Sequence, residues 1–234
     1  MKSILITGAS KGIGRVLALK LAEAGHAIGA VARSSAELHT LKAEIEAIGG
    51  KAEIFVGDIA DENLAKTAVA AMVERFGTLD IVVNNAGFGI FKKVENTDAD
   101  EWDAVMATNV RGTFLFSKAA ITPMKAQGSG HIVNIASDVA KRVFDGGSLY
   151  CASKYAQDAF SMALRKEVRK DGIKVSVVYS GLVDTHFHAH PQGNPHAADW
   201  LRDSDVADAI LYILNAPSHV VVDELMIHPL SQDY

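Results

Sequence analysis

The sequence has little cysteine, little proline and no long apolar run. Cys151 is the one cysteine among 234 residues, so no disulfide can form within the chain, and we expect a cytoplasmic protein in a reducing compartment. No apolar stretch approaches the roughly 18 residues that a membrane-spanning helix requires. The first residues enter a short apolar strand, which does not resemble a signal peptide. We therefore expect neither a secretory leader nor a membrane partner.

A strong charge of one sign is missing too. The chain carries 28 acidic and 23 basic residues, a net charge of -5, and no long basic run. This pattern argues against nucleic acid or an anionic membrane surface as the partner. Hydrophobic residues make up 49% and charged residues 22%, as in an ordinary globular protein.

What the sequence does have is a regular alternation of short apolar runs and longer amphipathic segments. Such an alternation places crossover helices on both faces of a parallel sheet. We therefore predict the α/β class: a doubly wound Rossmann fold with a seven-stranded, mainly parallel sheet, in a single domain over residues 1–234. The runs predict strands at 3–7, 27–32, 52–56, 79–83, 131–136, 173–179 and 220–227, and helices at 12–25, 35–48, 61–76, 98–127, 149–171 and 203–215.

A glycine-containing turn, Thr7-Gly-Ala-Ser-Lys-Gly-Ile-Gly14, joins the first strand to the first helix. Gly8 permits a tight turn, and Gly12 and Gly14 let the backbone approach a pyrophosphate. The helix N-terminus then offers free N–H groups to the phosphates. The turn lacks the Gly-Lys-Ser/Thr ending of a P-loop. It therefore predicts a bound dinucleotide, with an ordinary strand–helix turn as the alternative.

The end of the second strand bears on which dinucleotide binds. Sheets that bind NAD usually carry an acidic residue there, whereas this strand ends in Gly29-Ala-Val-Ala-Arg33. The planar fork of Arg33 can pair with a 2′-phosphate, and Lys11 adds a second positive charge. We therefore predict NADP(H), with NAD(H) less favoured. The alternative is that both are solvated surface cations.

Tyr150 and Lys154 lie four residues apart in a predicted helix and therefore share one face. A phenol with a pKa of about 10 is a poor proton donor or acceptor at neutral pH. A neighbouring cation is expected to lower that pKa toward the working range of a general acid/base. The spacing alone also arises by chance, so its meaning depends on the other motifs.

Taken together, these motifs resemble those of the short-chain dehydrogenase/reductase family over essentially the whole chain. Thr7–Gly14 is similar to the cofactor motif of that family, and Asn84-Asn85-Ala86-Gly87 is similar to its second signature. At the end of the second strand, Ala32 stands where NAD-specific members carry Asp. Ser180 stands where the family usually has Pro, so the following loop is expected to be looser.

The resemblance implies a catalytic set of Asn109, Ser137, Tyr150 and Lys154. Tyr150 would deliver a proton to the substrate oxygen, which Ser137 would position. Lys154 would hold the nicotinamide ribose, and Asn109 would kink its helix and anchor a water for proton relay. Taken singly, Ser137 could be a strand-end cap and Asn109 a helix-boundary residue.

The resemblance also implies further cofactor contacts in the turns that follow the strands. Asp58 would meet the adenine, although it could instead cap the next helix. Asn85 is expected to brace the central sheet, and a structural role is expected for Asn84. The full set of further contacts is Ser10, Ile13, Asp58, Ile59, Asn85, Ala86, Gly87, Gly181, Val183 and Thr185, beside Tyr150 and Lys154.

The segment at about 184–203 is irregular and predicts a substrate lid. It holds His186, His188 and His190, and three imidazoles can bind zinc. The segment offers no cysteine and the family chemistry requires no metal, so we expect no metal site. The residues expected to line the substrate pocket are Phe88, Phe144 and Phe187, with Ser137 and Tyr150; the basic pair nearby is Lys141-Arg142.

The expected function is an NADPH-dependent oxidoreductase that reduces a small ketone or aldehyde to an alcohol, or runs the reverse. One alternative is a dinucleotide sensor or scaffold without turnover. Others are a 3-oxoacyl-carrier reductase, or an epimerase or dehydratase, for which the chain is short. The resemblance implies a homotetramer or homodimer built on the helices at 98–127 and 149–171.

Overall fold

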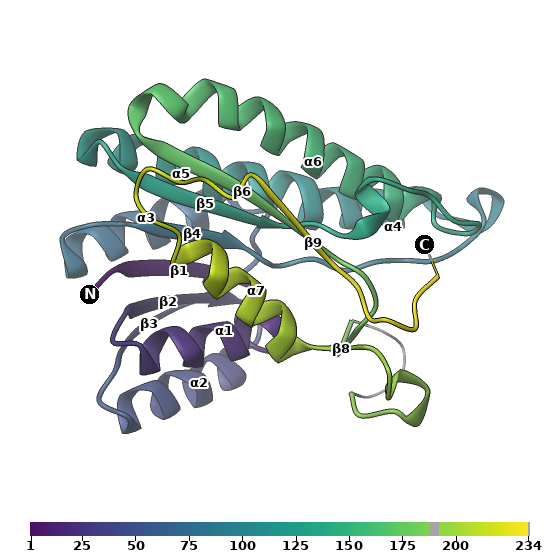
Figure 1. Cartoon of the computed structure of the whole chain (residues 1–234), viewed down its shortest axis with the longest axis horizontal. Helices are drawn as coiled ribbons and strands as arrows, with labels where there is room; N and C mark the ends of the chain where they lie inside the picture. The colour runs from purple at the N-terminus through teal and green to yellow at the C-terminus, as the bar shows by residue number, and fades with distance from the viewer. Residues whose placement is uncertain (188–191, 234) are drawn as a thin grey trace.

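Seven parallel strands form the central sheet of the protein (Figure 1). The computed structural model describes residues 1–187 and 192–233. The strand order is β3-β2-β1-β4-β5-β6-β9, and every neighbouring pair runs parallel, which confirms the predicted Rossmann-type sheet. The strands are β1 (Ser3–Thr7), β2 (Ala27–Ala32), β3 (Lys51–Val56), β4 (Ile81–Asn84), β5 (Gly130–Ile135), β6 (Ile173–Ser180) and β9 (Glu224–Ile227).

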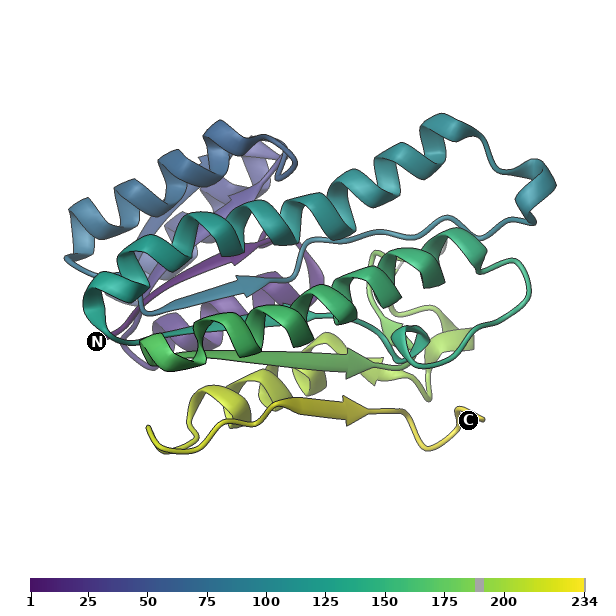
Figure 2. The same ribbon diagram turned by 90° about the horizontal axis from the view of Figure 1, so that it is seen from above.

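Helices cover both faces of this sheet (Figures 1 and 2). Ile4 and Ile6 of β1 point into the core on one face, and Leu5 points into the core on the other. Because both faces are buried, the strands are nearly continuous apolar runs. The first face is covered by α1 (Gly12–Glu23), α2 (Ser35–Ala47) and α7 (Asp203–Leu214), and the second by α3 (Glu62–Phe76), α5 (Thr113–Gln127) and α6 (Ser148–Val168).

The long helix expected over 98–127 is interrupted in its middle. It consists of α4 (Ala99–Met106), a π-helical segment η2 (Ala107–Gly112) and then α5. Such π-helical turns occur inside α-helices, frequently at functional sites. Asn109 lies in this turn, and its carbonyl accepts a hydrogen bond from the Thr113 hydroxyl at 2.9 Å.

A second, two-stranded sheet forms near the ends of the segment predicted as a substrate lid. Its strands β7 (Val183–Asp184) and β8 (Leu201–Arg202) pair in parallel before α7 begins. Strands of two residues leave no periodic pattern, so the sequence did not predict them. The remaining short elements are 3-10 helices: η1 (Val94–Asn96), η3 (Asp138–Ala140), η4 (Arg169–Asp171) and η5 (Pro195–Ala197).

The functional crevice follows from the strand order. The chain moves from β1 outward through β2 and β3, then returns to β4 on the other side of β1. In doubly wound sheets, ligands bind outside the carboxyl ends of the strands at this switch point. Across the described residues, none of the helices has the length and apolar character needed to span a bilayer.

Candidate active site

The turn after β1 forms a cradle that leaves no room for side chains at Gly8 and Gly14. Gly8 and Gly12 have φ angles of +68° and +53°. A Cβ atom on Gly14 would lie 2.5 Å from the Gly8 carbonyl oxygen and 2.5 Å from Asn85 Nδ2. The turn borders a cavity of about 450 Å³. The open backbone at the start of α1 fits the phosphates of a dinucleotide.

The end of this cavity near β2 holds two cations and one acid. Arg33 is exposed there, directly after β2. Lys11 Nζ forms an ion pair with Glu37 Oε1 at 2.9 Å. The hydrogen bond from Lys11 holds the pKa of Glu37 below its ordinary value, so this carboxylate is ionised at neutral pH. Sequence analysis missed Glu37 because an acid in the first turn of a helix is also a common charge complement to the helix dipole.

Asp58 is a turn residue beside the same cavity, which Ile59 also lines. Its Oδ1 accepts a hydrogen bond from the Ala60 N–H at 2.9 Å. The cap of α3 is Asp61, whose side chain accepts from the Asn63 N–H at 2.8 Å. The carboxylate of Asp58 is therefore not needed as the helix cap.

The two asparagines at the end of β4, Asn84 and Asn85, contact different parts of the protein. Asn85 Nδ2 donates to the carbonyl oxygens of Thr7 at 3.0 Å and Gly8 at 3.2 Å, which ties β4 to β1 beside the cradle. Asn84 is buried, and its Nδ2 donates to Ser117 Oγ and to Asn134 Oδ1. Asn84 therefore braces the sheet against α5, whereas Asn85, Ala86 and Gly87 face the crevice.

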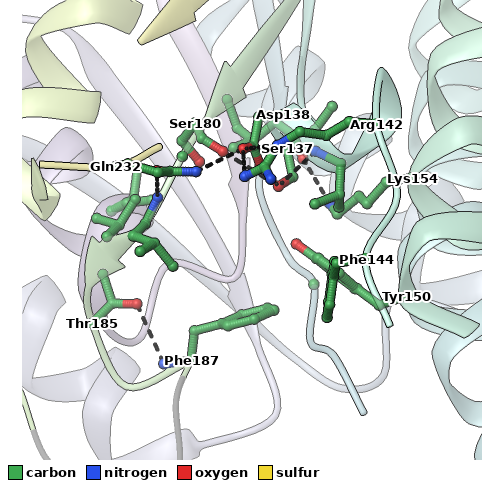
Figure 3. A pocket seen from close by; sticks show the side chains of 18 of the residues that line it. Ser137, Asp138, Arg142, Phe144, Tyr150, Lys154, Ser180, Thr185, Phe187 and Gln232 are labelled. Carbon is green, nitrogen blue, oxygen red and sulfur yellow. Dashed lines mark hydrogen bonds and ion pairs between the residues drawn. The ribbon is translucent and has the colours of Figure 1, made fainter. Parts of the chain in front are cut away.

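A second cavity of about 410 Å³ continues from the first at the carboxyl ends of β5 and β6 (Figure 3). Ile13, Asn85, Gly87, Thr185 and Phe187 line both cavities, so the two are parts of one crevice. The further predicted site residues at this second cavity are Ser137, Phe144, Tyr150, Lys154, Gly181 and Val183.

The Tyr150 side chain is buried, with its hydroxyl in the cavity (Figure 3). Burial raises the pKa of Tyr150 above its ordinary value, and a hydrogen bond with Ser137 opposes this effect only in part. The direction is opposite to the expected lowering by a neighbouring cation. Lys154 Nζ lies 5.8 Å from the centre of the ring and directs its hydrogen bonds elsewhere. The phenol is therefore protonated at neutral pH.

Lys154 sits at the end of a buried hydrogen-bonded chain. Its Nζ donates to the Ile135 carbonyl and to Gln157 Oε1, both at 3.0 Å. Gln157 Nε2 donates to Thr113 Oγ1 at 2.9 Å, and Thr113 in turn contacts the Asn109 carbonyl. Burial lowers the pKa of Lys154 to about 7. Sequence analysis missed Gln157, because its spacing from Lys154 does not distinguish a buried partner from a surface residue.

Asn109 lies one layer behind the cavity. Its Oδ1 accepts from the Phe88 N–H at 3.0 Å, and its Nδ2 donates to the Phe88 carbonyl and to Ser153 Oγ, both at 2.9 Å. Ser153 Oγ donates to the Tyr150 carbonyl at 2.7 Å. The fully buried amide of Asn109 thus fixes the loop after β4 against the first turn of α6.

A buried carboxylate next to Ser137 organises the other wall of the cavity (Figure 3). Ser137 Oγ lies 3.0 Å from Asp138 Oδ1 and 3.3 Å from the Ser180 carbonyl, either of which can accept its proton. Asp138 Oδ2 accepts from Arg142 Nε and from Gln232 Nε2, both at 2.8 Å. Gln232 belongs to the C-terminal tail, to which the sequence analysis assigned no role.

Aromatic rings form the face opposite Asp138. The centre of the Phe91 ring lies 5.8 Å from that of Phe144, 5.4 Å from that of Tyr150 and 6.1 Å from that of Phe187. The rings of Tyr150 and Phe187 are 5.4 Å apart. The structure places Phe88, expected in the substrate pocket, at the first cavity, while Phe91 lines the second. Two phenylalanines so close in sequence cannot be told apart by pattern.

A comparison with known protein families identifies the family of the protein that carries this crevice. The short chain dehydrogenase model matches residues 2–194. The chain belongs to the short-chain dehydrogenase family. An uncharacterized oxidoreductase of Staphylococcus aureus (strain USA300) is 33% identical over 229 residues, which cover 98% of this chain and 97% of that protein.

Solved structures of short-chain dehydrogenases match the fold closely. An alcohol dehydrogenase from Thermococcus sibiricus, complexed with 5-hydroxy-NADP, has a TM-score of 0.94 and 31% identity, over 100% of this chain and 99% of that one. The closed form of a serine dehydrogenase complexed with NADP+ has a TM-score of 0.90 and 26% identity, over 99% of this chain and 96% of that one. The protein is thus an oxidoreductase of this family, and its structural neighbours include NADP complexes.

The loop after β6 of this short-chain dehydrogenase is held by the C-terminal tail. The Leu182 N–H donates to Gln232 Oε1 at 2.8 Å, beside Ser180, which replaces the usual proline. Further along, Thr185 Oγ1 accepts from the Phe187 N–H at 3.3 Å. The tail thus tethers the segment that was expected to be loose.

The histidines of the lid are only partly within the described structure. His186 lines the first cavity, whereas His188 and His190 lie outside the described residues. Over residues 1–187 and 192–233, no group of three His, Cys, Asp or Glu side chains is arranged to hold a metal ion.

Proposed function

We propose that the protein is an NADPH-dependent carbonyl reductase that converts a small ketone or aldehyde to an alcohol, or runs the reverse, with Tyr150 as general acid/base. One observation carries the proposal: a buried, protonated phenol and a buried lysine meet Ser137 at a cavity continuous with the glycine cradle. Perturbed titratable groups in a cleft are typical of catalytic sites.

The residues around the first cavity fit a dinucleotide with a 2′-phosphate. The crowded positions of Gly8 and Gly14 support close approach by a pyrophosphate. Arg33 and Lys11 support a bound 2′-phosphate, for which Glu37 would have to release Lys11. When bound, the nicotinamide supplies the hydride that the reduction requires.

The protein would supply and control the proton. Tyr150 donates its phenolic proton to the carbonyl oxygen of the substrate as hydride reaches the carbon, which yields the alcohol and oxidised cofactor. Ser137 Oγ, freed from Asp138 or from the Ser180 carbonyl, donates a second hydrogen bond to the same oxygen. The ammonium form of Lys154 stabilises the phenolate that remains.

The finer assignments follow from this proposal. Asn109 is a positioning residue, since its amide is used in holding the loop at Phe88. We place the enzyme in the cytoplasm as a single domain with a substrate lid at about 184–203. Exposed Trp102 and Phe114, on α4 and α5, support assembly as a homodimer or homotetramer.

A panel of ketones, aldehydes and alcohols, followed by NADPH absorbance, tests the function. We expect turnover on neutral carbonyl compounds and a higher kcat/KM with NADPH than with NADH. A kcat/KM for NADH that equals or exceeds that for NADPH would contradict the cofactor assignment. Tight NADPH binding without turnover on any compound would favour the dinucleotide sensor instead.

A further inference from the structure

Two of the charged side chains that line the catalytic cavity, Asp138 and Arg142, are already paired with each other. Arg142 directs Nε and Nη2 at Asp138 Oδ2, and Asp138 is only 3% exposed. Lys141, which the sequence placed beside Arg142 as a basic pair, turns away to Asp158 at 2.8 Å. Among the described residues of the cavity lining, the basic side chains are Arg142 and the buried Lys154.

This pairing disfavours a substrate that carries a carboxylate or phosphate. An anion that formed an ion pair with Arg142 would leave the buried Asp138 with fewer partners. The anion would also lie close to the Asp138 carboxylate, which repels it. Because Asp138 is buried, taking its cationic partner away would leave a charge with little solvent to stabilise it, which is unfavourable. The Gln232 amide reinforces the pair, since it donates to the same oxygen of Asp138.

The aromatic rings define what the cavity can bind instead. Phe91 is 45% exposed and Phe144 40%, so two of the four rings present open apolar surface. The rings come from the loop after β4, the segment after η3, α6 and the lid. They enclose the reacting phenol, because the rings of both Phe91 and Phe187 contact that of Tyr150. A planar group next to the carbonyl could stack there, where aromatic pairs add attraction beyond buried area.

The size of the space limits the substrate to a small molecule. Ile13 and Asn85, which were predicted to contact the cofactor, line this cavity of about 410 Å³. The cavity must therefore also admit the nicotinamide. The tail residues Gln232 and Asp233 form part of its wall. The remaining volume suits one ring and a short substituent better than a long acyl chain.

We propose that the substrate is a neutral ketone or aldehyde that carries an aromatic or similarly bulky apolar group beside the carbonyl, recognised by Phe91, Phe144 and Phe187. This inference rests on the proposed carbonyl reductase function and names its substrate class. It sets the protein apart from its neighbour named serine dehydrogenase, whose named substrate is charged.

Four related compounds test the proposal: pyruvate, methyl pyruvate, benzoylformate and methyl benzoylformate. They vary the charge and the phenyl group independently. We expect kcat/KM for methyl benzoylformate to exceed that for methyl pyruvate and that for benzoylformate by about tenfold or more each. A keto acid that equals or outperforms its ester, or a methyl ester that equals or outperforms the phenyl ester, overturns the proposal.

Variants assign the preference to the named residues. Phe91→Ala should lose about tenfold in kcat/KM on methyl benzoylformate and less than about threefold on methyl pyruvate, whereas Tyr212→Ala, an exposed aromatic on α7, should change neither. An equal loss on both esters in Phe91→Ala contradicts the assignment.

Binding separates this proposal from the proposed function. Isothermal titration of the four compounds into the protein with NADP+, which has no hydride to transfer to a carbonyl, reads the ranking without any reaction. If none is reduced but the phenyl ester still binds best, the carbonyl reductase proposal fails and the ligand class stands. If turnover occurs with another ranking, the ligand class fails and the reductase proposal stands.

Discussion

At the scale of single residues, the decisive feature is a lysine that is buried and that, within the described part of the chain, donates hydrogen bonds to two neutral partners. The ammonium group of Lys154 donates to the Ile135 carbonyl and to Gln157 Oε1. Desolvation lowers its pKa to about 7, so small changes in its surroundings alter its charge near neutral pH. Gln157 therefore controls whether Lys154 can stabilise a phenolate.

Substitutions of Gln157 should move the pH dependence of the reaction in opposite directions. If activity requires the ammonium form, it falls as pH rises through the pKa of Lys154. Gln157→Leu removes an acceptor and lowers this pKa, so the falling limb of kcat should move to lower pH, by about one unit. Gln157→Glu adds a negative charge, so the limb should move to higher pH.

Rate profiles between pH 5 and 10 distinguish this role from a structural one. A merely structural role would lower kcat in both variants without moving the limb, and that result would contradict the assignment. Ser161, further along α6, bonds to the Gln157 carbonyl and not to its amide. Ser161→Ala is therefore a matched control that should leave the limb in place.

Most of the catalytic cavity, but not its supporting residues, could be predicted from the sequence. Ser137 directly follows a predicted strand, and Tyr150 and Lys154 share a helical face, so simple geometry and motif spacing bring them together. The supporting residues could not be predicted, because each of them contacts residues distant in sequence. They are Gln157, Asp138, Phe91 and Glu37. The pKa of Tyr150 was misjudged for the same reason, because burial outweighs the charge of a neighbour that spacing alone reveals.

At the scale of elements, the sequence predicted the regular strands and helices, but it did not predict local irregularities within them. The central strands were predicted within about two residues at most ends because both of their faces are buried, so their composition is distinctive. The π-helical turn at Ala107–Gly112 has no comparable signature, since one extra residue per turn barely disturbs an apolar stripe. The strand β9 is shorter than the predicted 220–227.

The cradle between β1 and α1 provides a prediction at this scale. In Gly14→Ala, the new Cβ would press against the Gly8 carbonyl and Asn85 Nδ2, both at 2.5 Å. The turn must then shift, and NADPH binding measured by calorimetry should weaken by about tenfold or more.

The matched control is Gly25→Ala at the end of α1. Gly25 has a φ of +81° and open space around its Cβ position. This substitution should cost about 1 kcal/mol of unfolding free energy through backbone strain and leave the NADPH affinity unchanged. Equal affinities in the two variants would show that the cradle does not contact the cofactor.

At the scale of the whole molecule, the sheet carries a buried histidine whose protonation affects global stability. His131 on β5 is 8% exposed, and its Nε2 lies 2.8 Å from Ser176 Oγ on β6. Desolvation, assisted by the nearby charges of Lys174 and Lys2, lowers its pKa to about 4. In the folded protein, His131 therefore stays neutral until the pH falls to about 4.

This shift predicts how stability depends on pH. Below about pH 6.5 the unfolded chain binds a proton at His131, but the folded chain does so only below about pH 4, so acid favours unfolding in this window. The unfolding free energy should fall by roughly 3 kcal/mol between pH 6.5 and 4 through this residue. Urea titrations should show a smaller fall in His131→Asn, and an unchanged fall in His39→Asn on the surface. An equal fall in wild type and His131→Asn would contradict the account.

The central claim for the molecule is that Tyr150 donates a proton to the carbonyl oxygen of a substrate bound in the catalytic cavity. The most direct measurement is the turnover of Tyr150→Phe on the best carbonyl substrate, together with its NADPH affinity. We predict a fall in kcat of at least about 100-fold, with the dissociation constant of NADPH within about threefold of wild type, since only one hydroxyl is removed from a ring that stays packed. Turnover near the wild-type rate would contradict the account.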